Sequence, residues 1–185
     1  MILKKGFTLI ELIMLIAIIG ILAGSGAWLM FHTIKNSVFI PNQLNMDKLA
    51  SDALSIMIDG DSQAKGLRFS RVITGMLPNQ VDFTIKNDLG NDVAISYRLT
   101  AGVLSRRIGA LGTYAPLPYY SGIAILSGKS NTLFTYYNAT EGMPLTAADV
   151  RRIQINLIAK TGSGLYNDWQ GSSERATSVA VKRFQ

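Results

Sequence analysis

The sequence contains no cysteine. A disulfide bond, a catalytic thiolate and a zinc–thiolate site are therefore excluded, and a domain outside the cytoplasm would depend on its core and its neighbours for stability. Histidine is almost absent too: the one histidine, His32, lies in an apolar stretch near the N-terminus. A serine–histidine triad needs a histidine beside its nucleophile. We therefore expect no enzyme, and we expect neither a metal site nor a cofactor.

Charge is scarce, at 16% of the residues, and it is basic in balance: 18 Lys and Arg stand against 12 Asp and Glu, a net charge of +6. Lys4 and Lys5 account for two of these cations. A surplus spread over a whole domain is typical of a solvated surface. Nucleic-acid binding is an alternative that charge alone does not favour.

A long stretch without charge occupies the N-terminal region. From Leu12 to Ile34, 23 residues, no side chain is fully charged if His32 is neutral. As a helix this run measures about 34 Å, enough to cross a hydrocarbon core of about 30 Å. Lys4 and Lys5 precede it, which predicts a cytoplasmic N-terminus and a C-terminal domain on the far side of the membrane. A secretory signal cleaved near Ser25 is the alternative, but this run is about twice as long as a usual signal core.

One acidic residue, Glu11, stands at the start of this apolar run. A carboxylate in a membrane helix is costly, and such residues usually have a partner. Glu11 is therefore expected to have a cationic partner.

The segment Lys5-Gly6-Phe7-Thr-Leu-Ile-Glu11-Leu, followed by an apolar helix, resembles the leader junction of type IV prepilins and type II secretion pseudopilins. The resemblance implies that a prepilin peptidase and methyltransferase cleaves between Gly6 and Phe7 and methylates the new N-terminus of Phe7. It also implies that Glu11 meets the Phe7 ammonium group of a neighbouring subunit, a pairing that relieves the cost of two buried charges. The implied partners are this peptidase, other pilin or pseudopilin subunits, inner-membrane lipid and the assembly platform.

The same resemblance implies an organisation in four segments. Residues 1–6 are the leader, 7–34 the transmembrane and filament-core helix, 35–60 its amphipathic continuation, and 61–185 a periplasmic, β-rich globular domain. The chain would first cross the bacterial inner membrane once and later enter a periplasmic or extracellular filament.

The helix is expected to continue into the globular domain. After Lys35 the apolar residues become periodic, at spacings that form one stripe on a helix: Met46, Leu49, Ala50, Ala53, Leu54 and Met57. The helix should end near Asp59-Gly60-Asp61. Pro41 should kink or interrupt it.

Beyond Leu67 the period changes to two, which predicts antiparallel strands. We expect hairpins with strands at 81–85, 93–99 and 103–106, joined by turns at 87–92 and 101–102. Further strands are expected at 122–126, 132–137, 150–159 and 177–183, with loops at 109–121 and 161–175.

Two segments of this region carry a finer resemblance. Residues 95–108 are similar to a hairpin of J-type minor pseudopilins (general secretion pathway protein J) and PilW-like minor pilins, and residues 146–157 are similar to a strand entry in the same groups. This similarity favours a minor subunit over a major pilin.

Three sets of surface residues leave alternatives open. Asn87, Asp88, Asn91 and Asp92 favour a turn over a calcium site, because their spacing is not that of an EF-hand. Three basic pairs favour a solvated sheet edge over a nucleic-acid surface: Arg106-Arg107, Arg151-Arg152 and Lys182-Arg183. The aromatic residues fit either a core or a binding patch: Tyr114, Tyr119, Tyr120, Tyr136, Tyr137, Tyr166 and Trp169.

The sequence therefore predicts an α+β, type IV pilin-like fold in which a long N-terminal helix packs on an antiparallel sheet. The predicted function is that of a structural filament subunit. The alternative is a membrane-anchored periplasmic binding module that does not polymerise, with a DNA- or surface-binding role.

Overall fold

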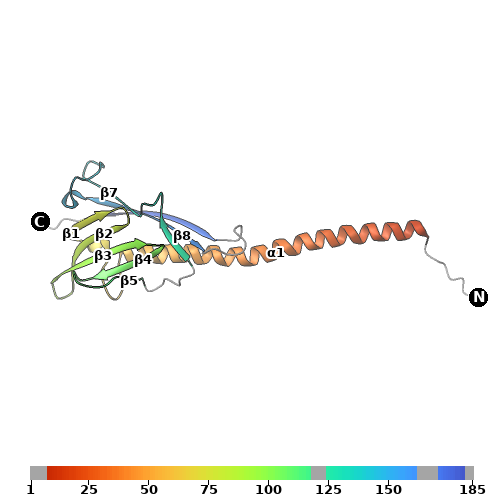
Figure 1. Cartoon of the computed structure of the whole chain (residues 1–185), viewed down its shortest axis with the longest axis horizontal. Coiled ribbons are helices and arrows are strands. Elements are labelled where there is room, and N and C mark those ends of the chain that lie inside the picture. Colours follow the sequence, from red (N-terminus) through yellow and green to blue (C-terminus); the bar gives the residue numbers. More distant parts are fainter. Residues whose placement is uncertain (1–7, 118–123, 162–170, 182–185) are drawn as a thin grey trace, which may run out of the picture. The chain divides into compact units, whose positions relative to one another are not determined.

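The structure is a computed structural model, and it describes residues 8–117, 124–161 and 171–181, except the side chains of Ala124 and Ile125. Contacts divide the chain into two compact units, residues 1–40 and residues 41–185. One helix, α1 (Leu9–Ile58), contributes to both units (Figure 1). Every strand found in the described residues belongs to the second unit.

Helix α1 is assigned as one element that includes Pro41. Of the two effects expected of Pro41, the interruption is therefore wrong, and the kink stays a prediction. Proline removes a single backbone donor, the one that would bond to the carbonyl of Ser37, and the hydrogen bonds of the flanking turns are sufficient to continue the helix. The helix ends at Ile58, where Gly60 takes a φ of +93° that suits glycine and donates its N–H to the carbonyl of Ile56.

The apolar stripe on the C-terminal part of α1 is buried, as its periodicity predicts. Leu49 is only partly buried, and Ile56 joins the stripe from a neighbouring position. These side chains share one core with the strands, and the fully buried members include Phe83, Ile95, Tyr97, Leu104, Phe134, Ile153, Ile155 and Leu157. The prediction of a long helix packed on antiparallel sheet is confirmed.

The first sheet is an antiparallel meander in the order β1-β2-β3-β4-β5. Its bounds are β1 (Val72–Leu77), β2 (Gln80–Lys86), β3 (Asp92–Thr100), β4 (Val103–Ile108) and β5 (Ala115–Pro116). Phe83 pairs with Ile95 and Tyr97 with Arg106, so both predicted hairpins are confirmed. The turn between β3 and β4 has positive φ at Ala101 and Gly102, which suits a tight hairpin.

The second sheet is built around β8 (Arg152–Thr161). β9 (Ser172–Ala180) pairs along nearly all of β8, so the other edge of β8 is shared by β6 (Ala124–Gly128) and β7 (Phe134–Tyr137). All three pairings are antiparallel.

Two boundaries of the predicted loops are wrong. The strand β9 begins at Ser172, so residues 172–175 are not part of a loop, because pairing with β8 outweighs a local sequence that has no apolar alternation. The expected loop at 109–121 contains the short β5. The expected strand residues 122–123 and 182–183 lie outside the described residues.

Candidate assembly site on the N-terminal helix

The first turn of α1 is closed by a reciprocal contact between Thr8 and Glu11. The backbone N–H and the hydroxyl of Thr8 both donate to Oε2 of Glu11, at 2.8 and 2.9 Å. The backbone N–H of Glu11 approaches Oγ1 of Thr8 at 3.3 Å. This is a capping box, in which a threonine before the helix and a glutamate three residues later satisfy each other's backbone donors. Glu11 therefore has a local role in starting the helix.

The Glu11 carboxylate has one oxygen to spare. Both contacts from Thr8 reach Oε2, and neither a hydrogen bond to Oε1 nor an ion pair of Glu11 is present among residues 8–117, 124–161 and 171–181. A carboxylate can accept on both oxygens. The arrangement therefore leaves Oε1 able to accept from a cation supplied by another molecule.

Residues Leu9–Ile40 of α1 form a largely apolar surface that no other described residue of their unit covers. The helix contains an 18-residue stretch that is long and apolar enough to cross a membrane, and none of the residues in that stretch is buried. The exposed large apolar side chains run from Leu9 and Ile10 at one end to Phe39 and Ile40 at the other. Such a surface needs lipid or other protein around it.

An aromatic cluster follows on this helix. The rings of Trp28 and His32 meet edge to face with centroids 4.3 Å apart, and Phe31 and His32 do so at 6.0 Å. His32 therefore belongs to an aromatic group near one end of the apolar run. Of the residues singled out for processing, Lys4, Lys5, Gly6 and Phe7 lie outside the described part of the chain.

In the second unit, the start of β9 is fixed to α1 through Gln43. Its side-chain amide donates to the carbonyl of Ser172 at 2.8 Å and accepts from the N–H of Ser172 at 3.0 Å. One turn later, Asp47 accepts from the hydroxyl of Ser173 at 2.6 Å and from Arg175 at 3.3 Å. The hydrogen bond from the Ser173 hydroxyl lowers the pKa of Asp47 below its usual value, and the nearby Arg175 lowers it further. Desolvation acts in the opposite direction but is outweighed.

The segment that follows α1 is fixed to β4 by a buried ion pair between Arg106 and Asp61. Nη1 of Arg106 donates to Oδ1 of Asp61 at 2.8 Å, and Nη2 donates to Oε1 of Gln63 at 2.7 Å. Close by, the hydroxyl of Tyr97 donates to the carbonyl of Ile56 at 3.0 Å. Burial raises the pKa of Tyr97 to about 12. These contacts hold the C-terminal turn of the helix against the first sheet.

The two basic pairs that the structure describes have partners on the protein itself. Arg106 is buried rather than solvated, which corrects the expectation of a solvated sheet edge for this pair. Its neighbour Arg107 points to the other face, where its guanidinium lies 5.1 Å from the ring of Tyr114. Arg152 begins the central strand β8, not an edge strand, and lies 4.1 Å above the ring of Tyr137.

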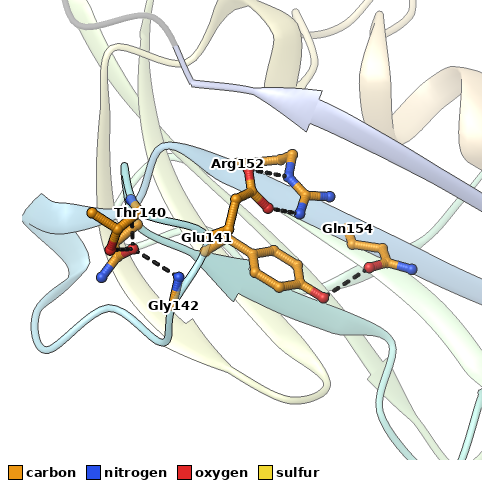
Figure 2. Close-up of polar contacts among 7 residues, drawn as sticks. Thr140, Glu141, Gly142, Arg152 and Gln154 are labelled. Atoms are coloured by element: carbon orange, nitrogen blue, oxygen red, sulfur yellow. Dashed lines mark hydrogen bonds and ion pairs between the residues drawn. The ribbon is translucent and has the colours of Figure 1, made fainter.

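Figure 2 shows how the loop after β7 completes the surroundings of Arg152. Asn138 accepts from the backbone N–H groups of Thr140 and Gly142, both at 2.9 Å, and so places Glu141 against the guanidinium of Arg152. Beside this pair, the hydroxyl of Tyr137 donates to Gln154 at 3.0 Å. The polar groups of this cluster bond to one another, and Asn138 and Thr140 also line a cavity of about 300 Å³ together with Leu145, Asp149 and Arg151. The pair Lys182-Arg183 lies outside the described residues.

Residues 87–91 form a turn, as expected, and Asp92 begins β3. Oδ1 of Asn87 accepts from the N–H groups of Leu89 and Asn91, and Gly90 has a φ of +80°. Asp88 pairs with Lys65 instead of facing the other acids. Across residues 8–117, 124–161 and 171–181, no three His, Asp or Glu side chains gather as a metal site would require.

The described members of the aromatic set named in the sequence analysis all contact other residues of the domain. Tyr136 packs against the core and its hydroxyl bonds to the carbonyls of Leu77 and Gln80. Tyr114 lies under Arg98, 3.8 Å from the guanidinium carbon, and its hydroxyl contacts Ser96 at 2.7 Å. The remaining members of the proposed aromatic set lie outside the description: Tyr119, Tyr120, Tyr166 and Trp169.

Comparison with known proteins gives a structural likeness but no match in sequence. No family model matches the sequence, and no curated protein matches it. Among solved structures, a type IV-like pilin from Thermus thermophilus aligns with 75% of this chain and 96% of its own, at a TM-score of 0.45 and 11% sequence identity.

Sequence reasoning missed three of these contacts. The capping box was readable as Thr8-Leu-Ile-Glu11, a threonine three residues before a glutamate at the start of an apolar run. The Arg106–Asp61 pair and the Gln43–Ser172 pair join residues 45 and 129 positions apart. No local signal marks contacts over such separations.

Proposed function

We propose that this chain is a structural subunit, a minor pilin or pseudopilin, of a type IV pilus or a type II secretion pseudopilus. It is inserted once in the bacterial inner membrane with its N-terminus in the cytoplasm. A prepilin peptidase cleaves it between Gly6 and Phe7 and methylates Phe7. The processed subunit then leaves the membrane and joins a helical filament in which the N-terminal helices form the core.

The observation that carries this proposal is the combination of one acidic residue with an uncovered apolar helix. Glu11 is the sole acid between the N-terminus and Asp47, and no described residue donates to its Oε1. The exposed side chains from Leu9 to Ile40 supply a surface that suits lipid before assembly and neighbouring helices after it. The segment Gly6-Phe7-Thr-Leu-Ile-Glu11 places a processed N-terminus four residues from that acid.

The physical role assigned to Glu11 is to pair with the ammonium group of a neighbouring subunit. A carboxylate and an ammonium in an apolar filament core each carry a desolvation cost, and bringing them together offsets it. Because Thr8 already donates to Oε2, one ammonium group at Oε1 would give both carboxylate oxygens a partner. The pairing would therefore set the register between subunits, since only one acid on each helix core is available.

The test is the variant Glu11→Ala in the full-length chain. The expected result is normal membrane insertion with loss of filament assembly, measured by resistance to carbonate extraction and by recovery of sheared filaments. Thr8→Ser is the matched control, because serine keeps both donors of the capping box and should assemble as the wild type does.

The competing function is an anchored binding module that never polymerises. It predicts that Glu11→Ala leaves function intact and that no filament fraction contains the wild-type chain. Normal assembly of Glu11→Ala would contradict the role given to Glu11.

A further inference from the structure

A short face of α1 carries the two basic groups nearest the end of its apolar run. Trp28, Phe31, His32 and Lys35 are spaced at i, i+3, i+4 and i+7, which places them on one side of the helix. The ring contacts of His32 with both Trp28 and Phe31 show that these three side chains lie next to one another. Trp28 is 65% exposed and Phe31 is 55% exposed, so this aromatic group does not belong to a core.

The charge on this face has no counterpart along the helix. Lys35 is the one fully charged side chain between Glu11 and Asp47, and no acidic residue lies in that interval. No ion pair of Lys35 occurs within the described residues. A lysine beside an aromatic group at the end of an apolar helix is the arrangement that membrane interfaces favour.

The position of Lys35 along the helix matches the thickness of a bilayer. Lys35 follows Glu11 by 24 residues, which corresponds to about 36 Å of helix. The hydrocarbon core measures about 30 Å. If Glu11 lies at the cytoplasmic boundary of the hydrocarbon core, Trp28 and Phe31 lie near the opposite boundary between acyl chains and headgroups. His32 and Lys35 then lie at the level of the phosphate groups on that side.

We propose that the helix face formed by Trp28, Phe31, His32 and Lys35 binds the phosphate group of an anionic phospholipid in the leaflet away from the cytoplasm. Lys35 supplies the charge, His32 supplies a further ring N–H donor, and the two aromatic rings lie against the acyl chains. The site fixes the depth of the helix in the membrane before assembly. This inference rests on the membrane insertion assumed in the proposed function.

The test uses the full-length chain carrying Trp169→Phe, which leaves Trp28 as the single tryptophan. It is reconstituted in equimolar phosphatidylglycerol and phosphatidylcholine, with bromine atoms on the acyl chains of one lipid at a time. The ratio of the two quenching efficiencies reports which lipid lies next to Trp28. Phosphatidylglycerol should be enriched there about fivefold, the factor expected for one lysine near an anionic surface.

Lys35→Gln should remove this enrichment, His32→Gln should reduce it, and Lys35→Arg should retain it. Lys48→Gln is the matched control, because Lys48 lies on the same helix but in the globular unit, and it should have no effect. Equal quenching by both lipids in the wild type, or enrichment that survives Lys35→Gln, would overturn the proposal. Loss of enrichment on adding inorganic phosphate would also overturn the proposal, because this helix face would then bind a free anion and not a lipid.

Insertion is measured on the same samples by carbonate extraction. An inserted chain without lipid enrichment contradicts the phosphate site and leaves the membrane anchor intact. A wild-type chain that is extracted by carbonate contradicts the proposed function itself.

Discussion

Arg106 and Asp61 form an ion pair inside the globular domain: Nη1 lies 2.8 Å from Oδ1, and the Arg106 side chain is 4% exposed. Asp61 follows the end of α1 by three residues, whereas Arg106 belongs to β4. The pair thus joins the end of the long helix to the first sheet. Two residues before Asp61, the pair of Asp59 and Arg68 is short as well, at 2.6 Å, but both side chains are exposed.

Removing Asp61 should therefore destabilise the domain far more than removing Asp59. Asp61→Ala leaves the Arg106 guanidinium buried without its carboxylate, a change that costs about 3 kcal/mol or more. Asp59→Ala breaks a surface pair worth about 1 kcal/mol at most. Denaturant unfolding of the full-length chain in detergent, followed by tyrosine and tryptophan fluorescence, measures both. Equal losses would contradict the buried role of Arg106.

Acid should weaken the same contact. Burial alone would raise the pKa of Asp61, but hydrogen bonds from Arg106 and from the backbone N–H groups of Gln63 and Ala64 outweigh burial and lower that pKa. A lowered pKa in the folded state means that stability is present above the ordinary value of 3.8 and is lost as pH falls through the folded value.

The measurement for this prediction is the free energy of unfolding between pH 7 and about pH 3, for wild type and for Asp61→Asn. The wild type should lose more stability on acidification than the variant does. Parallel curves for the two proteins would show that Asp61 does not contribute to acid sensitivity.

Gly171→Ala should displace the start of β9 from α1. A Cβ atom at Gly171 would lie 2.5 Å from the backbone carbon of Asn42, a distance that requires the two elements to separate. The Gln43–Ser172 hydrogen bonds depend on that approach. We expect a lower unfolding temperature and faster amide exchange at Ser172.

Gly142→Ala is the control for this change. A Cβ atom there would meet its nearest neighbour, the Asn138 amide, at 3.5 Å, which is ordinary contact. An equal effect of both substitutions would contradict the close packing assigned to Gly171.

Thr8→Val should loosen the first turn of α1 without affecting the globular domain. Valine lacks the hydroxyl that Thr8 uses to accept from the Glu11 N–H and to donate to Oε2. Amide exchange at Glu11 in micelles should become several-fold faster than in Thr8→Ser, which keeps the hydroxyl. Unchanged exchange would show that the cap does not hold this turn.

The parts of the fold that could be predicted from the sequence are those in which apolar residues recur with a regular period. The stripe from Met46 to Met57 predicted the buried face of α1, and the alternation around Phe83 and Ile95 predicted the central hairpins. In both cases burial follows directly from which side chains share a face. The strand β1 was not predicted, because Val72-Ile-Thr-Gly-Met-Leu does not alternate and a bulge near Gly75 shifts its register.

The candidate site was only partly readable for a different reason. Glu11 is conspicuous in the sequence as an acid in an apolar run, a pattern that indicates a cationic partner and does not point to the local contact with Thr8. The anchors of the domain, Gln43 and Arg106, are polar residues whose partners are distant in sequence. Their roles depend on the tertiary fold, which brings the pairs together.

The most direct test of the account is the intact mass and N-terminal sequence of the protein purified from its native membrane. The account predicts a chain that starts at N-methylated Phe7, with Glu11 as its fifth residue. A chain that still begins at Met1, or one cut near Ser25, would contradict processing as a pilin-like subunit and would favour an ordinary anchored or secreted domain.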